Sequence, residues 1–260
     1  MGFTADEIER RNWIARELLA KREPKDLLKW WGDIYGYAGK EDAEQRRIAN
    51  AFLLSCLVDY RRREKNDDPW YAVRAFLEQN PDFQHDLWRK ITSDYSQQEW
   101  CTDETFRRYK LHWMRPAHNR LWPIAENICY WFEGDARGIW CDGDALNTLL
   151  RLNWIGAGPQ ISRMIVGALK DCGIVSGKSD PKADVRVCRV IGRSVIGVAI
   201  DPANAFEAVR ICRELYPEDP WQLDGPIWLL GEKTCKDKNP DCANCYLRKQ
   251  CAFIQGSSAA

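Results

Sequence analysis

The sequence lacks an excess of charge of either sign. Its 260 residues carry 38 Lys and Arg against 38 Asp and Glu, so the formal net charge at pH 7 is zero. A protein without net charge has no global field that draws it onto nucleic acid or an acidic membrane surface. Any binding of a polyanion must therefore depend on local basic patches.

Long apolar runs are also missing. No apolar stretch approaches the length that spans a bilayer, and the first residues show no apolar core of a signal peptide. Eleven cysteines are present, but seven of them are scattered singly, which fits a reducing compartment better than a disulfide framework. We therefore expect a cytoplasmic protein that does not associate with membranes.

Strand-like alternation is almost absent, and apolar residues instead recur every three or four positions. This spacing is typical of amphipathic helices and predicts an all-α fold. A capping box at Thr4–Glu7 opens a helix that runs to about residue 22, and Ile8 belongs to its apolar stripe. Further helices are predicted over residues 24–31, 42–63, 69–79, 81–91, 116–131, 142–153 and 159–170.

Four of the cysteines are concentrated near the C-terminal end of the chain. Six, two and five residues separate Cys235, Cys242, Cys245 and Cys251. So many thiolates within seventeen residues indicate a metal or iron-sulfur site. Structural zinc sites usually contain two Cys-x2-Cys pairs or a Cys/His mixture, whereas this segment has one pair and no histidine. The spacing therefore favours a [4Fe-4S] cluster, with zinc as the alternative and a disulfide pair behind both.

A glycine-containing turn, Trp154-Ile-Gly-Ala-Gly-Pro-Gln160, joins the two helices predicted over residues 142–153 and 159–170. Gly156 and Gly158 permit positive φ angles and close approach of the backbone, and Pro159 suits the first turn of a helix. The unpaired amides and the dipole of the second helix both favour an anion such as phosphate. Many helical hairpins use glycine, however, so this turn alone is weak evidence for a phosphate site.

Asp184 directly precedes another stretch of helical periodicity. On its own it is predicted to be an N-cap, because its carboxylate can accept bonds from the first amides of that helix. A catalytic role is compatible with this one, since an acid held at a helix start is oriented, stays ionised and can face a cationic transition state.

Taken together, the hairpin and the cysteine segment resemble the endonuclease III family of DNA glycosylases. The turn resembles the family's Leu-Pro-Gly-Val-Gly hairpin, and Asp184-Val-Arg-Val-Cys-Arg-Val190 resembles its Asp-x-His-Val-x-Arg-Val segment. The resemblance covers residues 45–251 in order and spacing, and is sharp over residues 146–193 and 223–251. It implies two helical lobes with a DNA cleft between them. The expected parts are a six-helix barrel lobe over 46–174, a cluster lobe formed by 1–45 with 175–254, and a disordered tail over 255–260.

The resemblance also implies a chemistry. A monomeric enzyme is expected to hydrolyse the N-glycosidic bond of a damaged, mismatched or modified base in double-stranded DNA, near the nucleoid if the organism is bacterial. Asp184 is expected to stabilise the oxocarbenium-like sugar or to activate water after the base is flipped out. Gln160 stands where bifunctional relatives have a lysine nucleophile, so we expect a monofunctional enzyme. Substitutes for that lysine would be Lys170, Lys178 or Lys182.

The binding residues implied by the resemblance lie around the turn and beyond it. Between residues 160 and 193 there are seven basic and three acidic residues, which surrounds the presumed phosphate contacts with positive charge. One of them, Arg186, replaces the family's histidine. A [4Fe-4S] cluster on the four cysteines and a monovalent cation at the hairpin are the expected cofactors. The expected DNA contacts are Gly156, Ala157, Gly158, Gln160, Arg163, Lys182 and Arg186.

Other features leave more than one interpretation open. Residues 105–120 combine basic and aromatic side chains, which suits either a nucleic-acid face or an ordinary packed helix. Arg61–Arg63 fit a solvated helix end or a phosphate contact. Thirteen tryptophans are explained mainly by packing, which leaves one or two for base stacking. A residue in the turn after Leu57 is expected to fill the gap left by the flipped base.

A non-catalytic DNA-damage-binding module or a zinc-stabilised structural protein remain the alternatives to an enzyme.

Overall fold

The computed structural model describes residues 4–22, 32–58, 69–96, 99, 104–109 and 121–257. Every regular element in these residues is a helix, and β pairing there is limited to one isolated bridge between Asp144 and Ser176. The predicted all-α fold is therefore confirmed. In the same part of the chain, no helix combines the length and the apolar character needed to cross a membrane.

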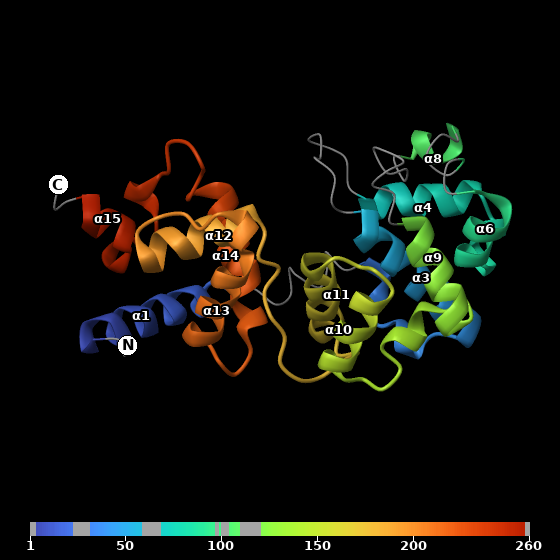
Figure 1. Cartoon of the computed structure of the whole chain (residues 1–260), viewed down its shortest axis with the longest axis horizontal. Coiled ribbons are helices and arrows are strands. Elements are labelled where there is room, and N and C mark those ends of the chain that lie inside the picture. Colours follow the sequence, from blue (N-terminus) through green and yellow to red (C-terminus); the bar gives the residue numbers. More distant parts are fainter. Residues whose placement is uncertain are drawn as a thin grey trace. The chain divides into compact units, whose positions relative to one another are not determined.

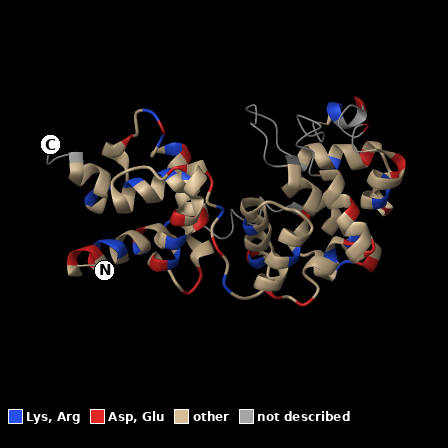
Figure 2. Cartoon of the chain, in the orientation of Figure 1, with Lys and Arg blue, Asp and Glu red and all other residues tan. Residues whose placement is uncertain are grey.

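The chain divides into two compact units (Figure 1). One unit comprises Leu28–Ser176, and the other combines Met1–Leu27 with Gly177–Ala260. The second unit is therefore discontinuous in sequence, and its N-terminal helix folds with the last third of the chain. Figure 2 shows that basic and acidic residues are scattered over the ribbon of each unit, in keeping with the zero net charge.

The unit of residues 28–176 is built around α3 (Asp42–Val58), whose residues from Phe52 to Val58 are all buried. Asn50 on the same helix is a buried polar centre, since its side chain accepts from Trp88 Nε1 and from the backbone N–H of Ala136, both at 2.9 Å. Its amide donates to the carbonyl of Gly134 at 3.2 Å. The other described helices of this unit are η1 (Gly32–Ile34), η2 (Tyr37–Gly39), α4 (Pro69–Gln79), α5 (Asp82–His85), α6 (Leu87–Asp94), α8 (Glu104–Arg108), α9 (Leu121–Phe132), η4 (Ala136–Ile139), α10 (Ala145–Trp154) and α11 (Pro159–Asp171).

The other unit packs α1 (Ala5–Ala20) against helices from the end of the chain. Ile14 and Leu18 of α1 share one apolar cluster with Val187, Ile211 and Ile227. Burial of these side chains is what joins the two separated segments. The remaining described helices of the unit are α12 (Val185–Ile191), the π-helical η5 (Gly192–Ile196), η6 (Pro202–Asn204), α13 (Ala205–Leu215), η7 (Pro220–Leu223), α14 (Asp224–Lys233), η8 (Cys242–Asn244), η9 (Arg248–Gln250) and α15 (Ala252–Ser257).

Several local predictions can be compared with these helices. The capping box at Thr4–Glu7 is confirmed, because each residue's side chain accepts a bond from the other's backbone N–H. Ile8 belongs to the apolar stripe predicted for the first helix, and its side chain is 48% exposed in the structure. The single helix predicted over residues 81–91 is wrong, since Asp86 has φ −144° and ψ 55° and separates α5 from α6.

Some predictions concern segments outside the described residues. These are the helix over residues 24–31, the arginines at 61–63, the turn after Leu57 together with its gap-filling residue, most of the basic stretch over 105–120, and the end of the tail.

Candidate functional site

The predicted hairpin joins α10 to α11 through a tight turn. Gly156 has φ +99°, a conformation that side-chain-bearing residues rarely adopt, so glycine is required there. The N–H of Ala157 bonds back to Leu152 O at 3.0 Å and closes the end of α10. Gly158 is the N-cap of α11, and Pro159 occupies its first turn, as expected for a residue that needs no amide partner. The sequence therefore folds this segment into two consecutive helices joined by the short turn of residues 155–158.

The start of α11 leaves backbone amides available. Ser162 N bonds to Gly158 O at 2.9 Å, and its hydroxyl donates to Ala157 O at 3.2 Å. No carbonyl of the described chain accepts from the N–H groups of Gly158, Gln160 or Ile161. Together with the dipole of a 13-residue helix, these amides can bind an anion. The Ala157 side chain is buried, so this residue can offer only its backbone.

Helix α9 holds the turn from one side. Ile124 Cγ1 lies 3.6 Å from the place where a Cβ on Gly156 would stand. Three residues further along α9, Asn127 donates a side-chain hydrogen bond to Ile155 O at 3.2 Å. Both contacts come from the same face of α9, because residues three apart are neighbours on a helix. The hairpin is thereby fixed within its own unit.

Asp184 is the N-cap of α12 in the other unit. Its Oδ1 accepts hydrogen bonds from the backbone N–H groups of Arg186 at 2.8 Å and Val187 at 3.1 Å. Its Oδ2 receives no hydrogen bond from any described residue, and the side chain is only half-buried. The predicted cap is thus confirmed, and it orients the carboxylate while one oxygen stays available for another partner. Burial, with a smaller effect from the negative charge of Asp184, raises the pKa of the Cys188 thiol to about 11.

The polar residues expected to contact DNA differ in what holds them in place. The guanidinium of Arg186 lies 4.6 Å from the ring centroid of Trp228 and 3.7 Å from the carboxylate of Glu232. This side chain is therefore held on α14 by a cation–π contact and an ion pair. Lys182 is fixed by its backbone, since its N–H donates to Asp224 Oδ1 at 2.7 Å. Arg163 and Gln160 are half-buried on α11 in the hairpin unit.

Two arginines that the sequence analysis did not single out tie α12 to the cysteine segment. Arg189 donates to Cys235 O at 2.7 Å and to Gly231 O at 2.8 Å. Arg193 donates to Lys236 O at 2.7 Å and to Cys235 Sγ at 3.8 Å. The sequence feature that could have identified them is their spacing of four residues, which places both on one face of the helical segment that Asp184 caps.

The four cysteines of the segment lie near one another. Burial, with smaller effects from the negative charges of Cys251, Cys235 and Cys242, raises the pKa of Cys245 to about 11. Burial likewise raises the pKa of Cys251, whose thiol contacts Arg193 O at 3.7 Å. Repulsion among four thiolates is relieved when they share a cationic metal centre and a neighbouring guanidinium.

The four cysteines offer thiol donors alone, with the guanidinium of Arg193 beside Cys235. Within the described residues, no three His, Cys, Asp or Glu side chains are close enough together to hold one metal ion. In a [4Fe-4S] cluster each thiolate binds a different iron, so its ligands stand further apart than those of a single ion. Four thiols and the guanidinium beside Cys235 fit such a cluster in chemistry and charge.

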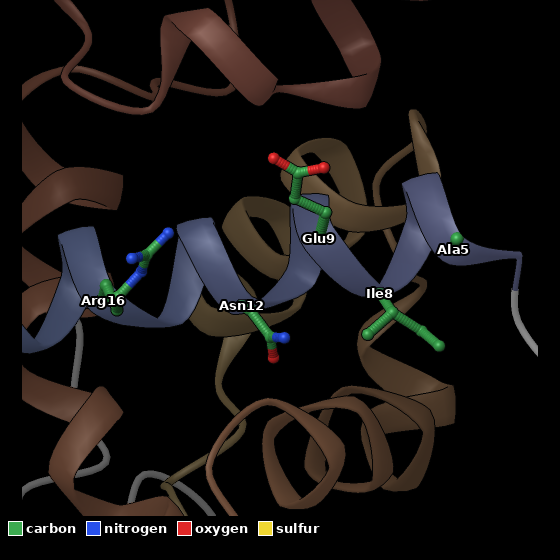
Figure 3. A pocket seen from close by; sticks show the side chains of 5 residues that line it. All are labelled: Ala5, Ile8, Glu9, Asn12 and Arg16. Atoms are coloured by element: carbon green, nitrogen blue, oxygen red, sulfur yellow. The ribbon is translucent and has the colours of Figure 1, made fainter.

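Two surface hollows lie elsewhere and do not include the hairpin, Asp184 or the cysteines. The first, of about 570 Å³, follows α1 (Figure 3), and there Glu9 points to the opposite side of the helix from Ile8 and Asn12. Its polar groups do not converge, so it is an open helix surface. The second, also of about 570 Å³, is lined by Tyr37, Asp135, Arg137, Gly138, Trp140, Cys141, Asp142, Gly143 and Ile174.

Part of the chain is similar in sequence to a known protein. Over 113 residues it is 29% identical to Endonuclease III of Thermotoga maritima, a region that covers 43% of this chain and 48% of that protein. The chain thus matches about half the length of that relative. No protein-family profile matches the chain.

Proposed function

We propose that this protein is a DNA glycosylase that removes a damaged, mismatched or modified base by hydrolysing its N-glycosidic bond. The proposal depends mainly on the hydrogen bonding of the Asp184 carboxylate. Two backbone amides fix its Oδ1, while its Oδ2 has no partner among the described residues. An oriented, half-buried carboxylate of this kind suits a reaction in which the sugar becomes cationic. The partial similarity to Endonuclease III supports the same class of activity.

The hairpin between α10 and α11 is proposed to bind the DNA backbone. The free amides of Gly158, Gln160 and Ile161 suit a phosphate oxygen and read no base, which fits an enzyme that must search any sequence. Arg163, Lys182 and Arg186 are the basic side chains proposed to add phosphate contacts. Unstacking the target base costs a few kcal/mol, which these backbone contacts help to offset.

The proposed reaction depends on the carboxylate of Asp184. Oδ1 keeps its bonds to the α12 amides, so the carboxylate keeps its orientation while Oδ2 faces the sugar. The negative charge stabilises the oxocarbenium-like sugar, or Oδ2 accepts a proton from the water that attacks it. Gln160 has no nucleophilic amine, so a Schiff base cannot form at that position and a monofunctional enzyme is favoured.

Cys235, Cys242, Cys245 and Cys251 are proposed to hold a [4Fe-4S] cluster. When bound, it cross-links residues 235–251 into a fixed loop. The chain's own contribution is the set of bonds from Arg189 and Arg193, which join that loop to the helix capped by Asp184.

A panel of duplexes tests the proposal. Each duplex carries one candidate base, such as uracil, a mismatched thymine, an alkylated purine, an oxidised pyrimidine or a hypermodified base. Strand breaks that arise only after alkali treatment are the expected result for at least one duplex. Specific binding of a lesion without any strand break would favour a DNA-damage-binding module, and stoichiometric zinc in a colourless preparation would favour a zinc-stabilised structural protein.

A further inference from the structure

Three aromatic side chains form a continuous exposed surface beside the hairpin. The ring centroids of Trp131 and Trp154 lie 4.5 Å apart with an interplanar angle of 41°, and those of Tyr130 and Trp131 lie 4.6 Å apart with their planes at 87°. Trp154 is 61% exposed, Tyr130 76% and Trp131 45%. Exposed rings in mutual contact form a large apolar surface, and its contact with water is unfavourable in free energy.

This surface is rigidly connected to the hairpin. On α9, Ile124, Asn127 and Trp131 contact Gly156, Ile155 and Trp154 in turn. The three α9 residues follow one helix face, and the seven residues from Ile124 to Trp131 span about 10 Å along α9, so Trp131 and Trp154 are held in place next to the turn. A DNA strand whose phosphate occupies the amides at the start of α11 can therefore bring a neighbouring base to Trp154.

The charge around the rings favours a base over a phosphate as the occupant. Glu126 is exposed and stands one turn before Tyr130 on α9, which places a negative charge beside the rings, and Arg151, one turn before Trp154 on α10, is paired with Asp142 at 2.8 Å. Nucleobases present a flat π face to aromatic rings whatever their sequence, and they do so once they are unpaired. The free face of Trp154 therefore suits an unpaired base.

We propose that Trp154, supported by Trp131 and Tyr130, is a stacking platform for an unpaired nucleobase of the DNA strand held at the hairpin. The platform rests on the proposed function, since extrusion of a base leaves unpaired bases next to the held phosphate. Its ligand class is single-stranded or gapped DNA, and the contact does not depend on base identity. The platform is separate from Asp184 and takes no part in bond cleavage.

The test uses the full chain and a duplex with a three-nucleotide gap that contains 2-aminopurine. Binding is expected to quench the 2-aminopurine fluorescence by stacking. Trp154→Ala is expected to remove the quenching and to weaken binding of the gapped duplex about tenfold, as loss of one base–aromatic stack does. Binding of an intact duplex and the salt dependence of affinity should not change, because no phosphate contact is lost.

Matched variants separate stacking from a general loss of apolar surface. Trp154→Phe keeps a ring and should retain most of the quenching. Leu146→Ala removes an equally exposed apolar side chain two turns away on α10, and Tyr71→Ala removes an exposed ring elsewhere in the same unit. Neither should alter binding of gapped DNA. Thermal unfolding of all four variants should match the wild type, because the substituted side chains are exposed.

The outcomes distinguish this proposal from the proposed function. If base release occurs but Trp154→Ala binds gapped DNA and quenches 2-aminopurine like the wild type, the platform is wrong and the glycosylase proposal stands. If no lesion is processed but binding of the gapped duplex depends on Trp154, the platform proposal is supported and the glycosylase proposal is not. If the wild type sediments as a dimer, Trp154→Ala as a monomer, and DNA binding is unchanged, the surface belongs to a second copy of the chain and the proposal is overturned.

Discussion

The guanidinium of Arg193 donates a hydrogen bond to the sulfur of Cys235 at 3.8 Å. The same guanidinium bonds to the carbonyls of Lys236 at 2.7 Å and Asp237 at 3.0 Å, so one side chain fixes the first cysteine and the two residues after it. It reaches them from η5, the continuation of the helix that Asp184 caps. The cysteine segment and the candidate catalytic acid are therefore joined through one helical segment.

Arg193→Ala is expected to impair retention of the iron-sulfur cluster. Hydrogen bonds to a charged group contribute about 1.5–3 kcal/mol each, and this change removes the three that Arg193 donates to the cysteine segment. Iron and acid-labile sulfide per chain should fall below those of the wild type. Arg210→Ala is the control, since Arg210 is an exposed arginine of the same unit paired with Glu207 and Glu214. Equal iron content in the two variants would contradict a role for Arg193 at the cysteines.

Gly156→Ala is expected to weaken duplex binding through the turn. An alanine would have to adopt φ +99°, which we expect to cost about 1 kcal/mol and to shift the amides at the start of α11. Gly173→Ala at the other end of α11 meets open space and has φ +72°, so it imposes the same kind of strain without touching the turn. Both variants should lose similar stability in thermal unfolding. Only Gly156→Ala should lower affinity for DNA, and an equal loss in both would argue against the turn as the contact.

Borohydride trapping is expected to give no covalent complex with DNA. Trapping requires a Schiff base between an amine and the opened sugar, and Gln160 supplies no amine at the position where bifunctional relatives have a lysine. The measurement is a gel shift that survives denaturation after reaction with an abasic duplex. A trapped complex would show that another lysine acts as nucleophile. Single substitutions of Lys170, Lys178 and Lys182 would then identify it.

Stability measurements can separate the capping role of Asp184 from its chemistry. Asp184→Ala removes the acceptor for the N–H groups of Arg186 and Val187 and should lower the free energy of unfolding by about 1 kcal/mol. Asp184→Asn keeps an acceptor oxygen and should unfold close to the wild type. Denaturant unfolding of the two variants checks this. An equal loss for both would mean that the charge, and not the acceptor, stabilises α12.

The sequence was sufficient where structure depends on residues a few positions apart. The box at Thr4 and Glu7, the cap by Asp184 and the positive φ at Gly156 each follow from chemistry within four residues, and each is observed. The break at Asp86 was missed because neither proline nor glycine marks it. The exposure of Ile8 could not be predicted, because periodicity identifies a helix face but not what covers it.

Long-range relationships could not be predicted from the sequence. The bonds from Arg189 and Arg193 to Cys235 span more than forty residues, and no local pattern encodes them. Nor does the sequence distinguish a packed tryptophan from an exposed one, so Trp154 was not distinguishable from the buried Trp88. Such contacts depend on how separate helices pack, which helical periodicity leaves undetermined.

The most direct test of the account is base release by Asp184→Asn under single-turnover conditions, on whichever duplex the wild type processes. The variant keeps the cap acceptor but loses the negative charge, so we expect base release to fall at least a hundredfold while affinity for the duplex stays within about twofold. Base release at the wild-type rate would contradict the account, because Asp184 would then have no part in cleaving the glycosidic bond.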